Sequence, residues 1–158
     1  MRILFLLIFF SAGIINAKEI NGAFGYTFGD IHTEKQKQNA KIPYKIFQEC
    51  ILYTTYETQK IYKITAEYET DSETEAEKEA NFLEKAITQK YNIKTRNKRI
   101  SIVNGRKNQT WQYEKGNKKI TIRSYKSKKR YIITIEYIDK ILEEENQKEE
   151  KKVNTSGL

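Results

Sequence analysis

Apolar and polar residues alternate over several short stretches of the chain, which is typical of strands with one buried face. In residues 61–68, IYKITAEY, the apolar and aromatic positions recur at every second residue from Tyr62 onward. Residues 46–56, IFQECILYTTY, are rich in residue types that favour strands. Because a short polar link joins the two stretches, they predict a β-hairpin.

Helical periodicity replaces this alternation in residues 71–91, DSETEAEKEANFLEKAITQKY. Ser72 and Glu75 have the spacing of a capping box, in which each side chain satisfies a free backbone N–H of the first turn. Acidic residues open the segment and lysines close it, as the helix dipole favours. The apolar stripe that we expect to pack on the sheet consists of Ala76, Ala80, Leu83 and Ile87.

Strand periodicity returns after the helix in four stretches, at residues 99–103, 109–114, 119–125 and 130–138. Asn104-Gly105 and Gly116-Asn117 are residue types that tolerate the positive φ of hairpin turns. The four stretches therefore predict an antiparallel meander. A short helix follows, and we expect residues 143–158 to form a polar, frayed tail.

The order of hairpin, helix and meander predicts an α+β fold. We expect a single antiparallel sheet of about five or six strands, with one long helix packed on one face and a C-terminal helical tail. Residues 18–142 form the one predicted domain, a length that suffices for a core of its own.

Residues 1–17 have the layout of a secretory signal peptide: one Arg, an apolar run, then small residues ending at Ala17. The apolar run from Ile3 to Ile15 is shorter than the roughly 20 residues that a membrane-spanning helix needs. We therefore expect cleavage near Lys18, no transmembrane span after processing, and export to the bacterial periplasm as a soluble protein.

The segment GAFGYTFGDIH, residues 22–32, carries Gly22, Gly25 and Gly29. Their spacing matches neither a dinucleotide-binding loop nor a phosphate loop, so we interpret them as turn and packing positions for Phe24 and Phe28.

With the Pro-led strand pair, the helix ending in KY and the Trp-containing meander, this opening resembles a diffuse group of small, mostly uncharacterised exported bacterial proteins. The resemblance implies export and the fold, and it carries over no catalytic residue.

Few residues suit catalysis or metal binding. Asp30 and His32, with Glu34, are a candidate acid–base group, and Glu114 is a carboxylate alone among basic residues. With one histidine and one cysteine, the sequence predicts no metal site and no cofactor. Cys50 is interpreted as a buried apolar thiol, the alternatives being an intermolecular disulfide or a reactive thiol.

Charge is distributed unevenly along the chain, whose formal net charge is +8. Residues 90–130 hold fifteen Lys or Arg and one acid, Glu114, which gives +14, whereas residues 67–84 hold eight acids and one lysine. Aromatic residues are interleaved with the cations, and this combination binds phosphates and stacks on rings. The candidate binding residues are Arg96, Arg99, Arg106, Trp111, Tyr113, Lys119, Arg123, Tyr125, Lys126 and Arg130.

These features predict a non-catalytic envelope protein that binds an anionic envelope component or an acidic protein partner through this basic region. Nucleic acid is disfavoured because an exported protein seldom meets it. Two alternatives stay open at this point. The lysines can serve solubility alone, and the protein can be a small envelope hydrolase that uses carboxylates.

Overall fold

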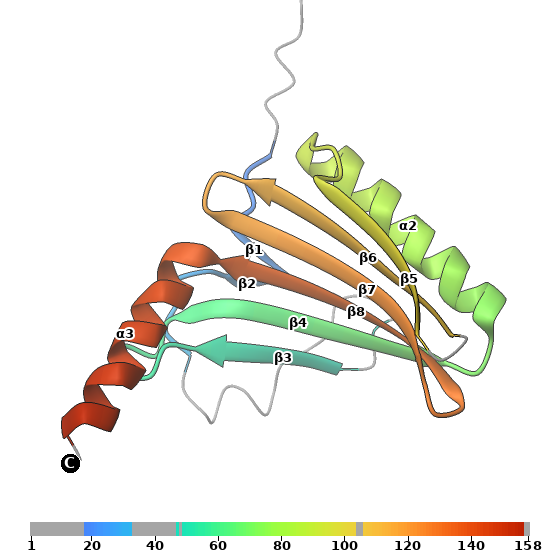
Figure 1. Ribbon diagram of the computed structural model, residues 1–158. Helices are drawn as coiled ribbons and strands as arrows, with labels where there is room; N and C mark the ends of the chain where they lie inside the picture. The colour runs from blue at the N-terminus through green and yellow to red at the C-terminus, as the bar shows by residue number, and fades with distance from the viewer. Residues whose placement is uncertain (1–17, 33–46, 48, 104–105, 157–158) are drawn as a thin grey trace, which may run out of the picture.

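Six antiparallel strands form the main sheet, in the spatial order β3-β4-β8-β7-β6-β5 (Figure 1). This computed structural model describes residues 18–32, 47, 49–103 and 106–156. The predicted signal peptide, residues 1–17, and the turn at 104–105 lie outside them. The strands are β3 (Glu49–Thr54), β4 (Ile61–Thr70), β5 (Asn97–Val103), β6 (Arg106–Lys115), β7 (Lys118–Ser127) and β8 (Arg130–Asp139); the helices are α2 (Glu73–Tyr91) and α3 (Lys140–Ser156).

The prediction of a single sheet was wrong, because β1 (Gly22–Ala23) and β2 (Tyr26–Thr27) pair as a second, two-stranded sheet. A Cβ on Gly22 would lie 1.9 Å from the carbonyl oxygen of Tyr26, so only glycine permits this close pairing. Phe24, at the turn, packs edge-on against Phe47 and Tyr137, with ring centroids 5.4 and 5.8 Å apart. Gly22 therefore has the predicted packing role, while Gly25 and Gly29, at φ of 88° and 86°, have the predicted turn role.

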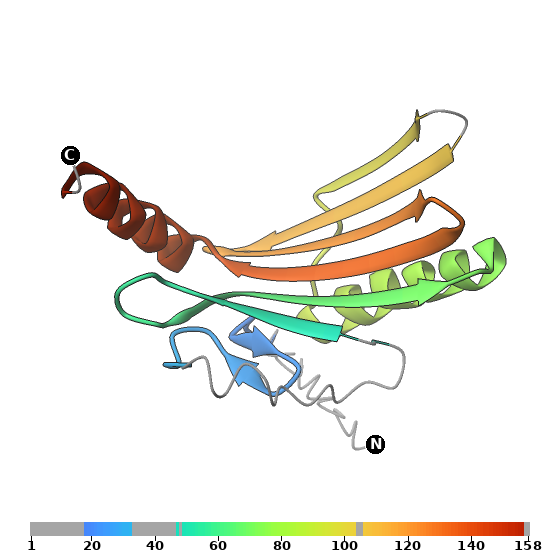
Figure 2. The same ribbon diagram turned by 90° about the horizontal axis from the view of Figure 1, so that it is seen from below.

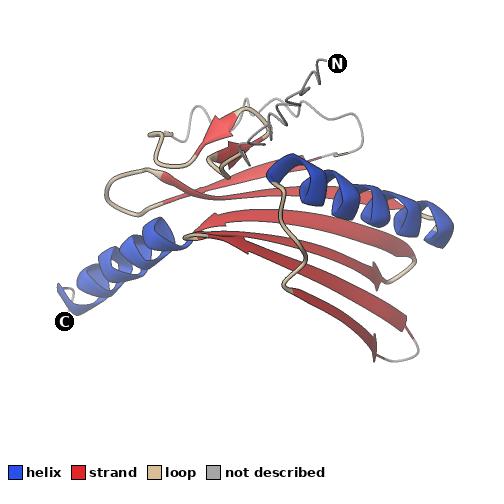
Figure 3. Cartoon of the chain, turned by 90° about the horizontal axis from the view of Figure 1, so that it is seen from above, coloured by secondary structure: helices blue, strands red, loops and turns tan. Residues whose placement is uncertain are grey.

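Alternate residues of the central strands form one buried core between the sheet and α2 (Figure 3). Helix α2 packs on β7, β8 and β4 through its predicted stripe and Tyr91. The expected arrangement of one long helix packed on one face was also wrong, because α2 covers only part of this face. The β1–β2 hairpin covers a further part of it, and Phe82, on α2, is 58% exposed. The core residues of the sheet include Ile64, Ala66, Trp111, Tyr113, Ile120, Ile122, Ile133 and Ile135.

Helix α2 and the β1–β2 hairpin lie on the same side of the main sheet, and no described element covers the opposite side as a layer (Figure 2). We call this opposite side the open face. Arg123 and Glu136 are among its residues, because strand alternation turns them away from Ile122 and Ile135. The chain thus has one apolar and one polar sheet face.

Ser72 caps α2 as predicted, and its Oγ accepts a hydrogen bond from the backbone N–H of Glu75 at 3.2 Å. The Glu75 carboxylate is directed to the neighbouring strand, where it accepts hydrogen bonds from Thr70 Oγ1 at 2.6 Å and Tyr68 Oη at 2.7 Å. These bonds, that of Thr70 first, lower the pKa of Glu75. The start of α2 is therefore hydrogen-bonded to the end of β4.

Helix α3 continues to Ser156, so the predicted frayed tail at 143–158 is helical over most of its length. It follows β8 directly, and Asp139 Oδ1 accepts hydrogen bonds from the N–H groups of Ile141 and Leu142 at 3.0 and 3.4 Å. Further along, Asn146 and Glu149 are buried and accept hydrogen bonds from backbone N–H groups of the β3–β4 turn. Polar contacts therefore hold α3 against the sheet.

Among the described residues, no helix is both long enough and apolar enough to cross a membrane.

Removal of the Glu149 side chain tests how α3 is held. We expect Glu149→Ala to lower the free energy of unfolding by about 1–3 kcal/mol, because the N–H of Glu57 loses the carboxylate oxygen 2.7 Å away. Urea unfolding measures the change. Glu144→Ala is the control, since Glu144 is exposed on the same helix, and its effect stays within about 0.5 kcal/mol. Equal effects of the two substitutions would contradict this role of Glu149.

Cys50 lies half-buried on β3, packed against the core, and burial raises its pKa to about 11 from 9.0. At pH 8 the folded protein therefore holds about a hundredfold less thiolate than the unfolded chain. We expect a thiol reagent to modify Cys50 in the native protein more slowly by at least that factor. The rates are compared with and without denaturant, and similar rates would show that Cys50 is a reactive surface thiol.

Candidate binding surface

Two of the candidate aromatic residues belong to the core. Trp111 and Tyr113 lie on the α2 side of β6 and are fully buried. The pKa of Tyr113 is raised, mainly by burial of its hydroxyl group. They cannot stack on a surface ligand, so this part of the predicted site is corrected. Strand alternation in the sequence could have revealed this burial, because Trp111 and Tyr113 lie two residues apart and so share one face of β6. In the sheet they pair with the core residues Ile122 and Ile120.

The acidic and basic segments of the chain meet in the folded protein. The end of β4 and helix α2 supply carboxylates that neutralise cations of the meander. The ion pairs between them are Arg130–Glu69 at 2.7 Å, Arg130–Asp71 at 3.8 Å, Lys107–Glu77 at 2.7 Å and Lys98–Glu84 at 3.7 Å. The +14 of residues 90–130 therefore overstates the charge that the surface presents.

The open face carries a mixture of charges. Arg99 and Arg123 both pair with Thr110 in the sheet and so lie in one row across β5, β6 and β7. Arg123 forms an ion pair with Glu136 at 2.7 Å. Arg99 and Lys119 form no ion pair among the residues that the structure describes.

Tyr125 is half-buried on the open face, and burial, followed by the charge of Glu67, raises its pKa. This face is therefore polar but not uniformly basic.

Lysines without carboxylate partners gather at the tip of the β7–β8 hairpin. Lys128 and Lys129 form its turn between the paired residues Ser127 and Arg130, and both lysines are exposed. Lys126 Nζ donates a hydrogen bond to Tyr131 Oη at 3.0 Å and lies 4.7 Å from the centre of that ring. We call Lys126, Lys128 and Lys129 the tip lysines. Figure 1 shows the hairpin extending at this end of the sheet.

Two further candidates take other positions. Arg96, before β5, forms an ion pair with Glu114 of β6, which also pairs with Lys140 of α3 at 3.0 Å. Arg106 begins β6, and its side chain lies outside the described part of the chain. Among the predicted residues, Trp111 and Tyr113 thus belong to the core, three cations are ion-paired, and three cations form no ion pair within the described residues. The paired cations are Arg96, Arg123 and Arg130; the others are Arg99, Lys119 and Lys126.

The two sets of candidate catalytic residues lie on different elements, with Asp30 and His32 in the opening segment and Glu114 on β6. The His32 ring packs edge-on against Tyr26, with centroids 5.7 Å apart. The backbone N–H of His32 donates a hydrogen bond to the carbonyl oxygen of Gln59, at the β3–β4 turn, at 2.9 Å. Glu34 lies outside the described residues, and Glu114 is engaged by Arg96 and Lys140. Within the described ranges, no group of three His, Cys, Asp or Glu side chains could hold a metal ion.

Comparison with models of known protein families and with curated protein sequences finds no match. The resemblance to small exported bacterial proteins therefore stays a prediction, and the site has to be interpreted from its own residues.

The two ion pairs of Glu114 predict a structural role for this carboxylate. We expect Glu114→Gln to lower the free energy of unfolding by about 0.5–1 kcal/mol at low salt, because it joins β6 to both Arg96 and the start of α3. The difference should shrink as salt screens these partly exposed charges. Urea unfolding at two salt concentrations tests this, with Glu144→Gln as a control that breaks no ion pair of the described residues. An undiminished loss at high salt would contradict the electrostatic role.

Proposed function

We propose that this is a non-catalytic exported protein that docks on an anionic surface of the bacterial envelope through the tip lysines. The observation that carries the proposal is that three lysines without an ion pair gather at one hairpin tip, whereas Arg99 and Lys119, which also form no ion pair among the described residues, stand singly on β5 and β7. Carboxylates of α2 and of the β4 end match Lys98, Lys107 and Arg130. Within the described residues, Lys126, Lys128 and Lys129 form no ion pair.

Geometry supports docking at this point. A shallow hollow of about 410 Å³ adjoins the turn. It is lined by Lys128, Lys129, Arg130, Ser127, the apolar side chain of Ile132 and Glu69, whose carboxylate is paired with Arg130 at 2.7 Å. Cations beside an apolar residue suit a headgroup region, where each lysine near an anionic surface contributes about 1 kcal/mol.

The pattern of residues 1–17 supports the exported location, in which phospholipid headgroups are the abundant anionic surface. An acidic protein is the other partner class that the sequence indicated. The acidic helix α2 of a second copy is a weak candidate for such a partner, because α2 already pairs with Lys98 and Lys107 in the same chain.

The test measures binding of the chain from Lys18 onward to vesicles that contain phosphatidylglycerol. We expect affinity to fall steeply as salt rises, since the Debye length shortens to about 8 Å at physiological salt. The double variant Lys128→Glu with Lys129→Glu should bind at least about 30-fold more weakly, from the loss of about 1 kcal/mol per lysine.

A matched control has the same change of net charge at another place. Lys78→Glu with Lys85→Glu alters two exposed lysines of α2, and it should retain most of the binding. Equal weakening by both double variants would show a response to net charge alone and would overturn docking at the tip. Absence of binding at low salt would overturn the proposal as a whole.

A further inference from the structure

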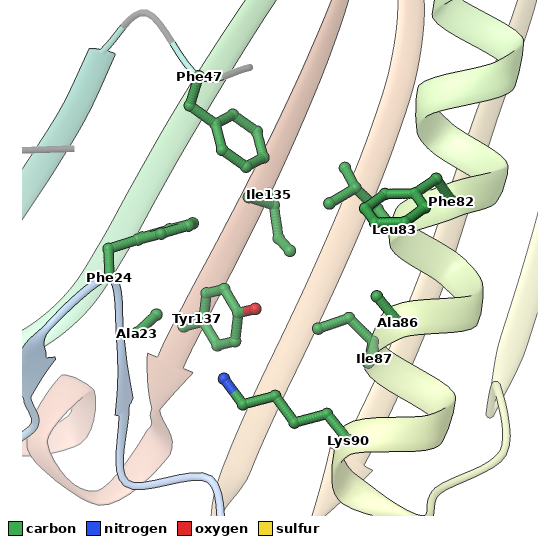
Figure 4. A pocket seen from close by; sticks show the side chains of 10 residues that line it. All are labelled: Ala23, Phe24, Phe47, Phe82, Leu83, Ala86, Ile87, Lys90, Ile135 and Tyr137. Carbon is green, nitrogen blue, oxygen red and sulfur yellow. The ribbon is translucent and has the colours of Figure 1, made fainter. Parts of the chain in front are cut away.

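A pocket opens between α2 and the β1–β2 hairpin, on the covered side of the main sheet (Figure 4). Its volume is about 170 Å³, and it belongs to no part of the surface discussed above. The pocket walls are apolar on three sides. Phe24 and Phe47 line one side, α2 lines the opposite side, and Ile135 of β8 forms the floor.

The α2 wall follows from the helical period. Leu83 and Ile87 are buried toward the sheet, Ala86 leaves room because its side chain is small, and Phe82 stands at the rim with 58% of its surface exposed. An apolar rim residue of this size costs free energy in water, which a ligand would recover by covering it. The apolar lining therefore suits an aliphatic group.

One charged group lies at this pocket. Lys90, in the last turn of α2, reaches across it toward Tyr137, as Figure 4 shows. The ammonium lies 5.1 Å from the centre of the Tyr91 ring, and it forms no ion pair with any carboxylate of the described residues. The side chain is exposed, so its charge stays hydrated and available.

We propose that this pocket binds the end of a single alkyl chain that carries an anionic group, with the anion at Lys90 and the chain between Phe24, Phe47 and α2. The charge of Lys90 and the apolar lining of the pocket favour this class of ligand. A cation would be repelled by the ammonium, and a polar ligand would leave its hydrogen-bonding groups unpaired against the aromatic walls. The volume holds about five to six methylene-sized groups, taken as roughly 30 Å³ each.

The inference does not depend on docking at the tip lysines, because the pocket uses different residues. Carboxylate and phosphate ends share the required chemistry and come from different sources, free fatty acids and phospholipid fragments. Octanoate and octyl phosphate therefore serve as the two anionic probes. Octanol and octyltrimethylammonium have the same chain with a neutral and a cationic end.

The experiment is calorimetric titration of the chain from Lys18 onward with these four ligands. We expect both anions to bind more tightly than octanol by about two- to fivefold, the range for an exposed ion pair, and the cation to bind most weakly. From butanoate to octanoate, affinity should rise about fourfold per methylene while the chain is still being buried. The stronger of the two anions indicates the source.

Two variants and one control locate the ligand. Lys90→Gln should reduce octanoate affinity to that of octanol and leave octanol unchanged, while Lys85→Gln, on the same helix but outside the pocket, should change neither. Ala86→Leu fills the pocket and should weaken all four ligands. The double variant Lys128→Glu with Lys129→Glu should keep octanoate binding, which separates this test from that of the proposed function.

Equal affinity for octanoate and octanol, or an equal effect of Lys90→Gln and Lys85→Gln, would overturn the assignment of the anion to Lys90. If none of the ligands binds, the proposal is wrong. If, in addition, Ala86→Leu abolishes a self-association seen by sedimentation, the pocket receives an apolar side chain of a second copy instead.

Discussion

The contact between α2 and the buried face of the main sheet determines how the other parts of the protein are arranged. Ala76 and Ala80 have small side chains, so the N-terminal half of the helix approaches the sheet closely, while Leu83 and Ile87 fill the space further along. Each of the two larger side chains contributes about 1.5–3 kcal/mol by leaving water. Because this contact fixes the path of the helix, it also fixes where the charges and side chains of α2 meet their neighbours.

Two consequences of that path concern function. Carboxylates of α2 lie beside the basic β5–β6 hairpin, so Glu77 and Glu84 neutralise cations of β6 and β5. The C-terminal half lies apart from the β1–β2 hairpin, and the space between them is the pocket that Lys90 borders. The same helix therefore reduces one candidate binding surface and builds another.

Much of the fold could be predicted from the sequence. Burial produces the period-two alternation of β4 and β8 and the apolar stripe of α2, and both patterns are visible in the sequence. The β1–β2 pairing was missed because two-residue strands are too short to show a period. The length of α3 was missed because buried polar side chains, Asn146 and Glu149, hold it, and a search for apolar residues does not detect them.

The candidate site was predictable only in part, for a related reason. Net charge along a segment says nothing about which carboxylates will face it, and those facing Arg130 come from residues 69 and 71. The tip lysines differ from the paired cations only through the tertiary structure. The pocket is lined by residues of four separate segments, so no local sequence pattern predicts it.

Helix α3 begins directly after β8, and this affects how motion of the sheet is transmitted to the helix. With no loop between Asp139 and Lys140, and with Lys140 N–H bonded to the carbonyl of Asn117, the helix is a rigid lever attached to the central strands. Its 17 residues span about 25 Å at 1.5 Å per residue. Because Asn146 and Glu149 are hydrogen-bonded to the β3–β4 turn, a rotation of the helix would carry this turn with it. A rotation of about 10° would displace the far end of the helix by roughly 4 Å on that length. A label near Thr155 would therefore magnify small changes in the twist of the sheet.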